Sequence, residues 1–160
     1  MKITLRIWRQ PAADQPGRYE RHGLADVSPD VSLLEALDQL NEQLISAGQR
    51  PVSFEHDCRE GICGSCGFLV NGQAHGPRGA TSVCQLYLRE FEDGAELTLE
   101  PWRAKAFPAI QDLMVERSSL DRLIAAGGYC STGTGQAPDG NALPVGRDQA
   151  TSAFSTATCI

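Results

Sequence analysis

Hydrophobic and polar residues alternate at the start of the chain. Ile3, Leu5 and Ile7 fall on one face of an extended segment, and polar residues stand between them. A period of two predicts a strand that is buried on one side. Residues 18–24 are a second, weaker strand candidate, and residues 96–100 alternate again.

A leucine-rich stretch after residue 32 repeats its apolar positions every three or four residues, which is the period of one face of an α-helix. Ser32 and Glu35 have the spacing of a capping box at its start, and Gly48 marks its end. We expect this helix to pack its apolar stripe against the sheet. The stripe consists of Leu33, Leu34, Leu37, Leu40, Leu44 and Ile45.

Two strands followed by one packed helix indicate an α+β domain. Residues 67–70 predict a further short strand, because they lead into Asn71-Gly72, a dipeptide typical of hairpin turns. Beyond about residue 103 the pattern changes. Residues 112–115 and 120–124 suggest short helical pieces, and the glycine-rich segment 127–147 predicts a loop.

The composition is that of a folded protein. Of the 160 residues, 41% are hydrophobic and 21% are charged, and the net charge is -6. The acidic balance argues against nucleic acid as a partner. The sequence contains no run of about 18 apolar residues, so no membrane span is predicted. Arg6 and Arg9 interrupt the N-terminal segment before the apolar core of a signal peptide develops, so we expect a cytosolic protein.

Six cysteines are the unusual feature of this composition. Four of them follow the pattern Cys58-x4-Cys63-x2-Cys66-x17-Cys84, which is plant-type [2Fe-2S] spacing with a shortened last gap. Such a cluster needs three thiolates from one loop and a fourth from elsewhere. These four cysteines are therefore the candidate ligands, and Cys130 is most simply a free thiol.

Glycines and polar residues around the cysteines fit a cluster loop. Gly61, Gly64 and Gly67 allow a tight turn and a close approach of backbone N–H groups to the sulfurs. A negatively charged cluster must be met by dipoles, so the Ser65 hydroxyl and Arg59 are candidates to set its potential. The three histidines are expected at the surface or in hydrogen bonds.

A structural zinc site is the alternative for the same four cysteines. Zinc sites usually pair two short Cys-x2-Cys knuckles, whereas Cys84 stands alone here. A disulfide scaffold is disfavoured because the chain is large enough to form its own core and carries no secretory signal.

The residues around these cysteines resemble the iron-sulfur subunit of succinate dehydrogenase and fumarate reductase. Residues 58–67 match the cluster loop of this family almost residue for residue, and Cys84-Gln85 continues the match. Residues 98–101 are similar to its domain end, and residues 107–115 to the segment that follows. The amino-acid sequence is most similar to the bacterial branch of the family, which pairs with a single dihaem cytochrome b anchor, in residues 71–77, 100–103 and 126–129.

The resemblance implies a ferredoxin-like β-grasp domain over residues 1–103, holding a [2Fe-2S] cluster, and the start of a helical ferredoxin domain over residues 104–160. It implies an electron-transfer subunit without substrate chemistry of its own. Electrons would pass from an FAD-containing flavoprotein subunit through the [2Fe-2S] centre toward quinone. The chain would lie peripherally on the inner face of the bacterial membrane, held there through its cytochrome b anchor subunit.

The chain departs from this family at its end. Family members continue into a helical domain that holds a [4Fe-4S] and a [3Fe-4S] cluster, whereas here Cys159 stands next to the last residue, Ile160. We expect Cys159 to be a ligand of a second cluster whose other ligands are missing, in a truncated chain. The small [2Fe-2S] subunit of a molybdenum hydroxylase is another alternative, although it carries a second all-cysteine cluster for which residues 101–158 offer only Cys130.

Overall fold

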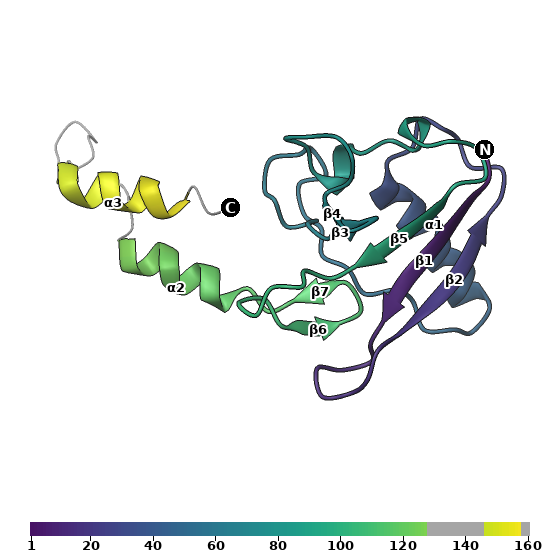
Figure 1. Ribbon diagram of the computed structural model, residues 1–160, viewed down its shortest axis with the longest axis horizontal. Coiled ribbons are helices and arrows are strands. Elements are labelled where there is room, and N and C mark those ends of the chain that lie inside the picture. The colour runs from purple at the N-terminus through teal and green to yellow at the C-terminus, as the bar shows by residue number, and fades with distance from the viewer. Residues whose placement is uncertain (128–145, 158–160) are drawn as a thin grey trace, which may run out of the picture. The chain divides into compact units, whose positions relative to one another are not determined.

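The computed structural model describes residues 1–127 and 146–157. The chain divides into two compact units, Met1–Glu116 and Arg117–Ile160 (Figure 1). Residues 104–116 therefore pack with the first unit. Each unit is described by itself below.

A five-stranded mixed sheet forms the first unit, in the order β2-β1-β5-β3-β4 (Figure 1). Its central pair, β1 and β5, is parallel, and the other neighbours are antiparallel. The strands predicted at the start of the chain, at residues 18–24 and at residues 96–100 are confirmed, and the one predicted at 67–70 forms over its last two residues. The bounds are β1 (Ile3–Arg9), β2 (Arg18–Leu24), β3 (Leu69–Val70), β4 (Gln73–Ala74) and β5 (Glu96–Glu100).

The turn between β3 and β4 has the predicted hairpin geometry. Asn71 and Gly72 both adopt positive φ angles, of 51° and 76°. Two consecutive left-handed residues match the right-handed twist of the flanking strands, which is why Asn-Gly is favoured here. This hairpin lies immediately after the last cysteine of the cluster loop.

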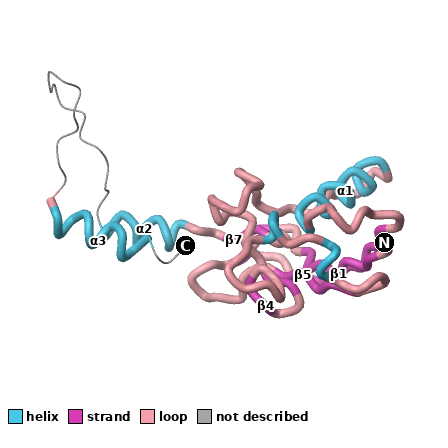
Figure 2. Tube along the Cα trace, turned by 90° about the horizontal axis from the view of Figure 1, so that it is seen from above, coloured by secondary structure: helices cyan, strands magenta, loops and turns pink. Residues whose placement is uncertain are grey.

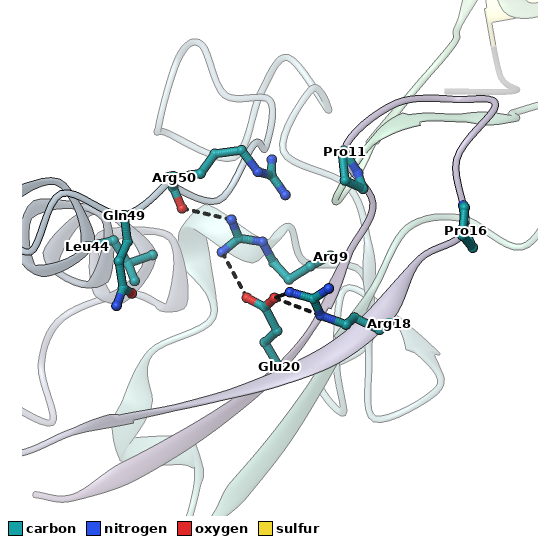
Figure 3. Close-up of a pocket in the computed structure, with 8 residues that line it drawn as sticks. All are labelled: Arg9, Pro11, Pro16, Arg18, Glu20, Leu44, Gln49 and Arg50. Carbon is teal, nitrogen blue, oxygen red and sulfur yellow. Dashed lines mark hydrogen bonds and ion pairs between the residues drawn. The ribbon is translucent and has the colours of Figure 1, made fainter.

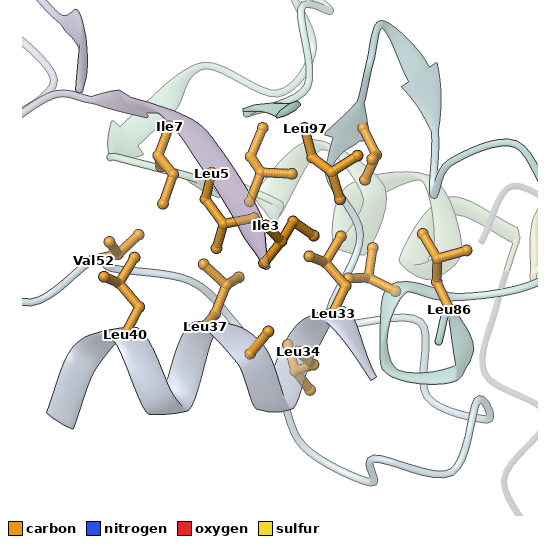
Figure 4. Close-up of a cluster of buried hydrophobic side chains, with 14 of the residues drawn as sticks. Ile3, Leu5, Ile7, Leu33, Leu34, Leu37, Leu40, Val52, Leu86 and Leu97 are labelled. Carbon is orange, nitrogen blue, oxygen red and sulfur yellow. The ribbon is translucent and has the colours of Figure 1, made fainter. Parts of the chain in front are cut away.

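Helix α1 (Leu33–Ser46) packs across the sheet and closes the core (Figure 4). Its capping box is formed by Ser32 and Glu35, and Gly48 ends it with a φ of 68°. Leucines of the helix point toward the alternating apolar residues of β1 and β5. The side chains at this interface include Ile3, Leu5, Ile7, Leu33, Leu37, Leu40 and Leu97, each at most 2% exposed.

One residue of the predicted stripe does not join this core. Ile45 is 61% exposed, whereas its neighbour Leu44 is buried. Leu33 and Leu34, two successive residues at the start of α1, are both buried, so the exposure of Ile45 is confined to the last turn of the helix. A mixed sheet covered by one helix confirms the α+β class and agrees with a ferredoxin-like β-grasp arrangement.

Two short 3-10 helices, η1 (Val83–Gln85) and η2 (Leu88–Glu90), lie between β4 and β5. The Leu33 N–H donates to the Leu86 carbonyl at 2.7 Å, and the Leu88 N–H donates to the Val31 carbonyl at 3.0 Å. These bonds hold the segment that carries Cys84 against the start of α1.

The prediction of a helical piece at residues 112–115 is wrong. This segment forms the turn and second strand of a hairpin, β6 (Ala109–Gln111) and β7 (Met114–Val115). Asp112 occupies the turn with a φ of 48°, and its side chain is fully buried. Contacts of that carboxylate with distant residues override the local helical pattern.

The second unit contains two helices, α2 (Ser118–Gly127) and α3 (Arg147–Ala157), which pack against each other (Figure 2). Helix α2 confirms the helical prediction for residues 120–124. The predicted loop at 127–147 falls mostly outside the described residues, and its two end residues belong to the helices. None of the helices in the described ranges is long and apolar enough to cross a membrane.

Candidate metal centre

The four candidate ligands lie on two segments of the first unit. Cys58, Cys63 and Cys66 stand on an irregular loop between α1 and β3, and Cys84 lies in η1. Cys58 and Cys63 are half-buried, whereas Cys66 and Cys84 are buried. All four are free thiols. The fold thus supplies the fourth cysteine from a separate segment, as the spacing requires.

The four thiols influence one another's pKa in two sets. Cys58 helps to lower the pKa of Cys63, and the neighbouring thiols of Cys66 and Cys84 shift each other's pKa. Among the residues that the structure describes, no group of three histidine, cysteine or acidic side chains is arranged to hold a single metal ion.

Backbone N–H groups of the loop converge on Cys58. Its Sγ accepts hydrogen bonds from the N–H groups of Glu60, Ile62 and Cys63, at 3.4, 3.4 and 3.3 Å respectively. Backbone N–H groups that point at one sulfur place three partial positive charges beside it. This convergence is the nest of amides expected around a negatively charged group.

Two of the cysteine sulfurs are each hydrogen-bonded to a serine hydroxyl. The Ser65 hydroxyl lies 2.9 Å from Cys63 Sγ, and the Ser82 hydroxyl lies 3.2 Å from Cys84 Sγ. Hydrogen bonds with Ser65, assisted by Cys58, lower the pKa of Cys63 to about 6. For Cys84, burial acts against the thiolate, but hydrogen bonds with Ser82 and its neighbours still lower the pKa.

Burial dominates at the innermost thiol. It raises the pKa of Cys66, and the neighbouring Cys84 adds to this effect. A buried thiol of this kind loses its proton most readily when a metal replaces it. The site therefore combines two thiols whose pKa is lowered, Cys63 and Cys84, with one whose pKa is raised, Cys66.

The course of the loop depends on left-handed residues. Arg59, Gly61 and Gly64 have φ angles of 56°, 74° and 71°, so two of the three predicted glycines serve the turn as expected. A Cβ on Gly61 would also approach Gln85 Cγ to 2.9 Å.

Gly67 serves a different purpose from the one predicted. Its φ lies outside the left-handed region, but a Cβ there would come within 2.8 Å of the Trp102 ring and 2.9 Å of the His75 ring. Those two rings meet edge to face at 5.1 Å between their centroids. Glycine is required at this position for packing space directly beside Cys66.

Arg59 forms an ion pair outside the thiol cluster. Its guanidinium binds the Asp38 carboxylate on α1, with Nη2 at 3.3 Å from Oδ1. This pair fastens the loop to the helix and raises the pKa of Arg59. In this structure Arg59 therefore positions the cysteine loop against α1.

Three residues at the site were missed by sequence reasoning. Ser82 stands two positions before Cys84, and Ser65 stands two positions after Cys63. This equal spacing could have indicated that Ser82, like Ser65, contacts a cysteine sulfur. Gln85 donates to the Arg59 carbonyl at 3.0 Å and so joins the two cysteine segments. Asp38 carries no local signal, because its partner Arg59 lies 21 positions away in the chain. Cys130 and Cys159 lie outside the described residues.

The chain is similar to proteins of one family. A model of the 2Fe-2S iron-sulfur cluster binding domain matches residues 4–122, and the chain belongs to this family. Its relatives are iron-sulfur subunits of fumarate reductase and succinate dehydrogenase.

Two curated relatives illustrate the similarity. The fumarate reductase iron-sulfur subunit of Wolinella succinogenes is 29% identical over 117 residues, covering 71% of this chain and 43% of that protein. The succinate dehydrogenase iron-sulfur subunit of Bacillus subtilis is 28% identical over 121 residues, covering 74% and 44%. The chain thus spans less than half the length of these relatives.

A solved structure shares the fold. A chain of the Mycobacterium smegmatis Sdh1 complex in the apo form superposes with a TM-score of 0.64 at 19% identity. The superposition covers 92% of this chain and 54% of the other.

Proposed function

We propose that Cys58 and Cys63 bind one iron of a [2Fe-2S] cluster, and that Cys66 and Cys84 bind the other. The supporting observation is that the match to the 2Fe-2S iron-sulfur cluster binding domain spans residues 4–122, which include all four cysteines. A two-iron cluster takes two thiolates at each iron, whereas a structural zinc ion takes four ligands around a single centre. The family match therefore favours iron-sulfur over zinc.

The bound cluster supplies one-electron exchange, and the chain's own residues set the conditions for it. N–H groups on Cys58 Sγ and the hydroxyls of Ser65 and Ser82 compensate negative charge at the sulfurs. Burial of Cys66 and Cys84 keeps water from one side of the site. On the other side, Ile62 is 77% exposed, which brings the loop to the surface where a redox partner can approach.

We further propose that the chain relays electrons between an FAD-containing flavoprotein subunit and quinone, as part of a succinate dehydrogenase or fumarate reductase complex. Its similarity to iron-sulfur subunits of both kinds of complex supports this role. The chain itself makes and breaks no bond of the substrate. In the complex it would sit on the cytoplasmic face of the membrane, bound through a cytochrome b anchor subunit.

Residues 104–160 are proposed to lead into a helical domain for a [4Fe-4S] and a [3Fe-4S] cluster. Helices α2 and α3 in this region are consistent with such a start. Cys159 would be the first ligand of that domain.

Metal analysis of anaerobically purified protein tests the cluster assignment. We expect two iron and two sulfide per chain and, after reduction, the EPR signal of a [2Fe-2S] centre. The C63A variant should lose this signal, while C130S should keep it. Stoichiometric zinc in place of iron, or an unchanged cluster in C63A, would overturn the assignment.

Affinity purification from the native host tests the relay separately. A flavoprotein carrying covalent FAD should co-purify, and succinate added to the complex should reduce the cluster. A molybdopterin protein in place of the flavoprotein would instead identify a molybdenum hydroxylase subunit.

A further inference from the structure

A cavity of about 450 Å³ lies on the first unit at the ends of β1 and α1 (Figure 3). Arg9, Arg18 and Arg50 contribute three guanidinium groups to its wall, and Glu20 contributes a carboxylate. Pro11, Pro16 and Leu44 form its apolar part. The cavity shares no lining residue with the cysteine loop, so it is separate from the candidate cluster site.

The most buried of these guanidinium groups, that of Arg9, is hydrogen-bonded at only one of its three nitrogens. The Arg9 side chain is 5% exposed, and its Nη2 donates to the carbonyls of Arg50 and Pro51 at 2.8 and 3.1 Å. Nε and Nη1 of Arg9 make no hydrogen bond. The nearest carboxylate oxygens, on Asp112 and Glu20, lie 3.4 and 3.9 Å away. Buried polar groups in folded proteins are nearly always hydrogen-bonded, so an acceptor is missing here.

The charges around the cavity do not balance. Both terminal nitrogens of Arg50 bind Asp112, and Arg18 binds one oxygen of Glu20 with Nε and Nη2. Three guanidinium groups therefore share two carboxylates, which leaves one positive charge in excess. That excess stands out in a chain whose net charge is -6.

We propose that this cavity binds a small molecule through an oxyanion group, a carboxylate or a phosphate. A guanidinium group presents planar, paired donors that match such a group. One anionic group would balance the excess positive charge beside the buried Arg9 and accept hydrogen bonds from guanidinium groups that line the cavity. The volume, together with the apolar wall of Leu44 and the two prolines, leaves space for a short organic chain attached to the anion.

Titration calorimetry on the whole cluster-loaded chain tests this proposal, with inorganic phosphate and butyrate as separate probes at constant ionic strength set by chloride. We expect saturable binding of at least one probe. Tighter binding of butyrate indicates that the apolar wall takes part, and tighter binding of phosphate indicates a site for a phosphate group. Absence of saturable binding for both probes overturns the proposal.

Variants of lining residues locate the site. R18Q should weaken binding roughly tenfold, because it removes an accessible donor at the mouth of the cavity. R21Q is the matched control: Arg21 stands on the same strand but pairs with Glu96, and it does not line the cavity. E20Q should tighten binding, because it removes a carboxylate that competes for Arg9 and Arg18. Equal effects of R18Q and R21Q, or weaker binding in E20Q, contradict the assignment.

Discussion

Asp112 accepts hydrogen bonds from both terminal nitrogens of Arg50, each at 2.8 Å, across 62 positions of the chain. The same fully buried carboxylate accepts the N–H of Gln10 at 2.7 Å and that of Ser53 at 3.0 Å. It thus joins the β6–β7 hairpin to the end of β1 and to the segment that leads into the cysteine loop.

The D112N substitution should destabilise the first unit strongly. It leaves Arg50 and the buried Arg9 without their shared carboxylate, and an uncompensated buried charge costs about 3–5 kcal/mol. We expect a loss of that order in the free energy of unfolding, measured by urea denaturation under anaerobic conditions. D30N is the control, since the exposed pair of Asp30 with Arg89 is worth at most about 1 kcal/mol. Equal losses in both variants would show that Asp112 is not the centre of this network.

The G67A substitution should disturb the packing behind Cys66. The added Cβ would approach the rings of Trp102 and His75 to less than 3 Å, and overpacking of this kind costs about 1–3 kcal/mol. A lower unfolding midpoint and a reduced iron content are the expected results. The matched control is G79A, because a Cβ at Gly79 meets nothing within 4 Å. Normal stability in G67A would mean that the two rings move aside freely.

The S65A substitution should lower the reduction potential of the loaded protein. The Ser65 hydroxyl lies 2.9 Å from Cys63 Sγ, and its dipole favours the more negative, reduced state. We expect a decrease of roughly 60 mV, which corresponds to a tenfold change in the equilibrium of a one-electron couple. An EPR-monitored redox titration measures it, with S65T, which keeps the hydroxyl, as the control. An unchanged potential in S65A would remove this hydroxyl from the tuning of the site.

Two histidines should make the protein less stable as the pH falls. Burial lowers the pKa of His75. The pKa of His22 is lowered by burial and by the nearby positive charge of Arg9, which together outweigh the opposing effect of Glu20. The unfolded chain therefore takes up protons first, so this stability is full above the unfolded pKa of about 6.5 and is lost as the pH falls below it. Urea denaturation between pH 7.5 and 5.5 (roughly one unit either side of that value) should show the loss.

The double variant H22Q/H75Q isolates this effect. It should show a shallower decrease of unfolding free energy over the same pH range, because neither position can then bind a proton. A decrease as steep as that of the unchanged chain would assign the pH dependence to other groups.

Local patterns in the sequence were sufficient for much of the first unit. Alternation predicted β1 and β5, a weaker strand pattern predicted β2, and a capping serine and a terminal glycine predicted both ends of α1. The spacing of the cysteines predicted a [2Fe-2S] domain, which is the family to which the chain belongs, and the ligand set Cys58, Cys63, Cys66 and Cys84 stays a prediction. These features can be predicted from the sequence because each depends on residues close together in the chain.

Contacts between distant residues decided the rest. The turn at Asp112 follows from partners at positions 10, 50 and 53, and these outweigh a local helical pattern. The need for glycine at position 67 comes from rings at 75 and 102. The neighbourhood of Cys66 and Cys84 comes from the docking of η1 against the start of α1. The sequence by itself determined which elements form and which thiols are available. The tertiary structure alone decided which thiols and which charges are buried, because burial and electrostatic energies depend on distances in space.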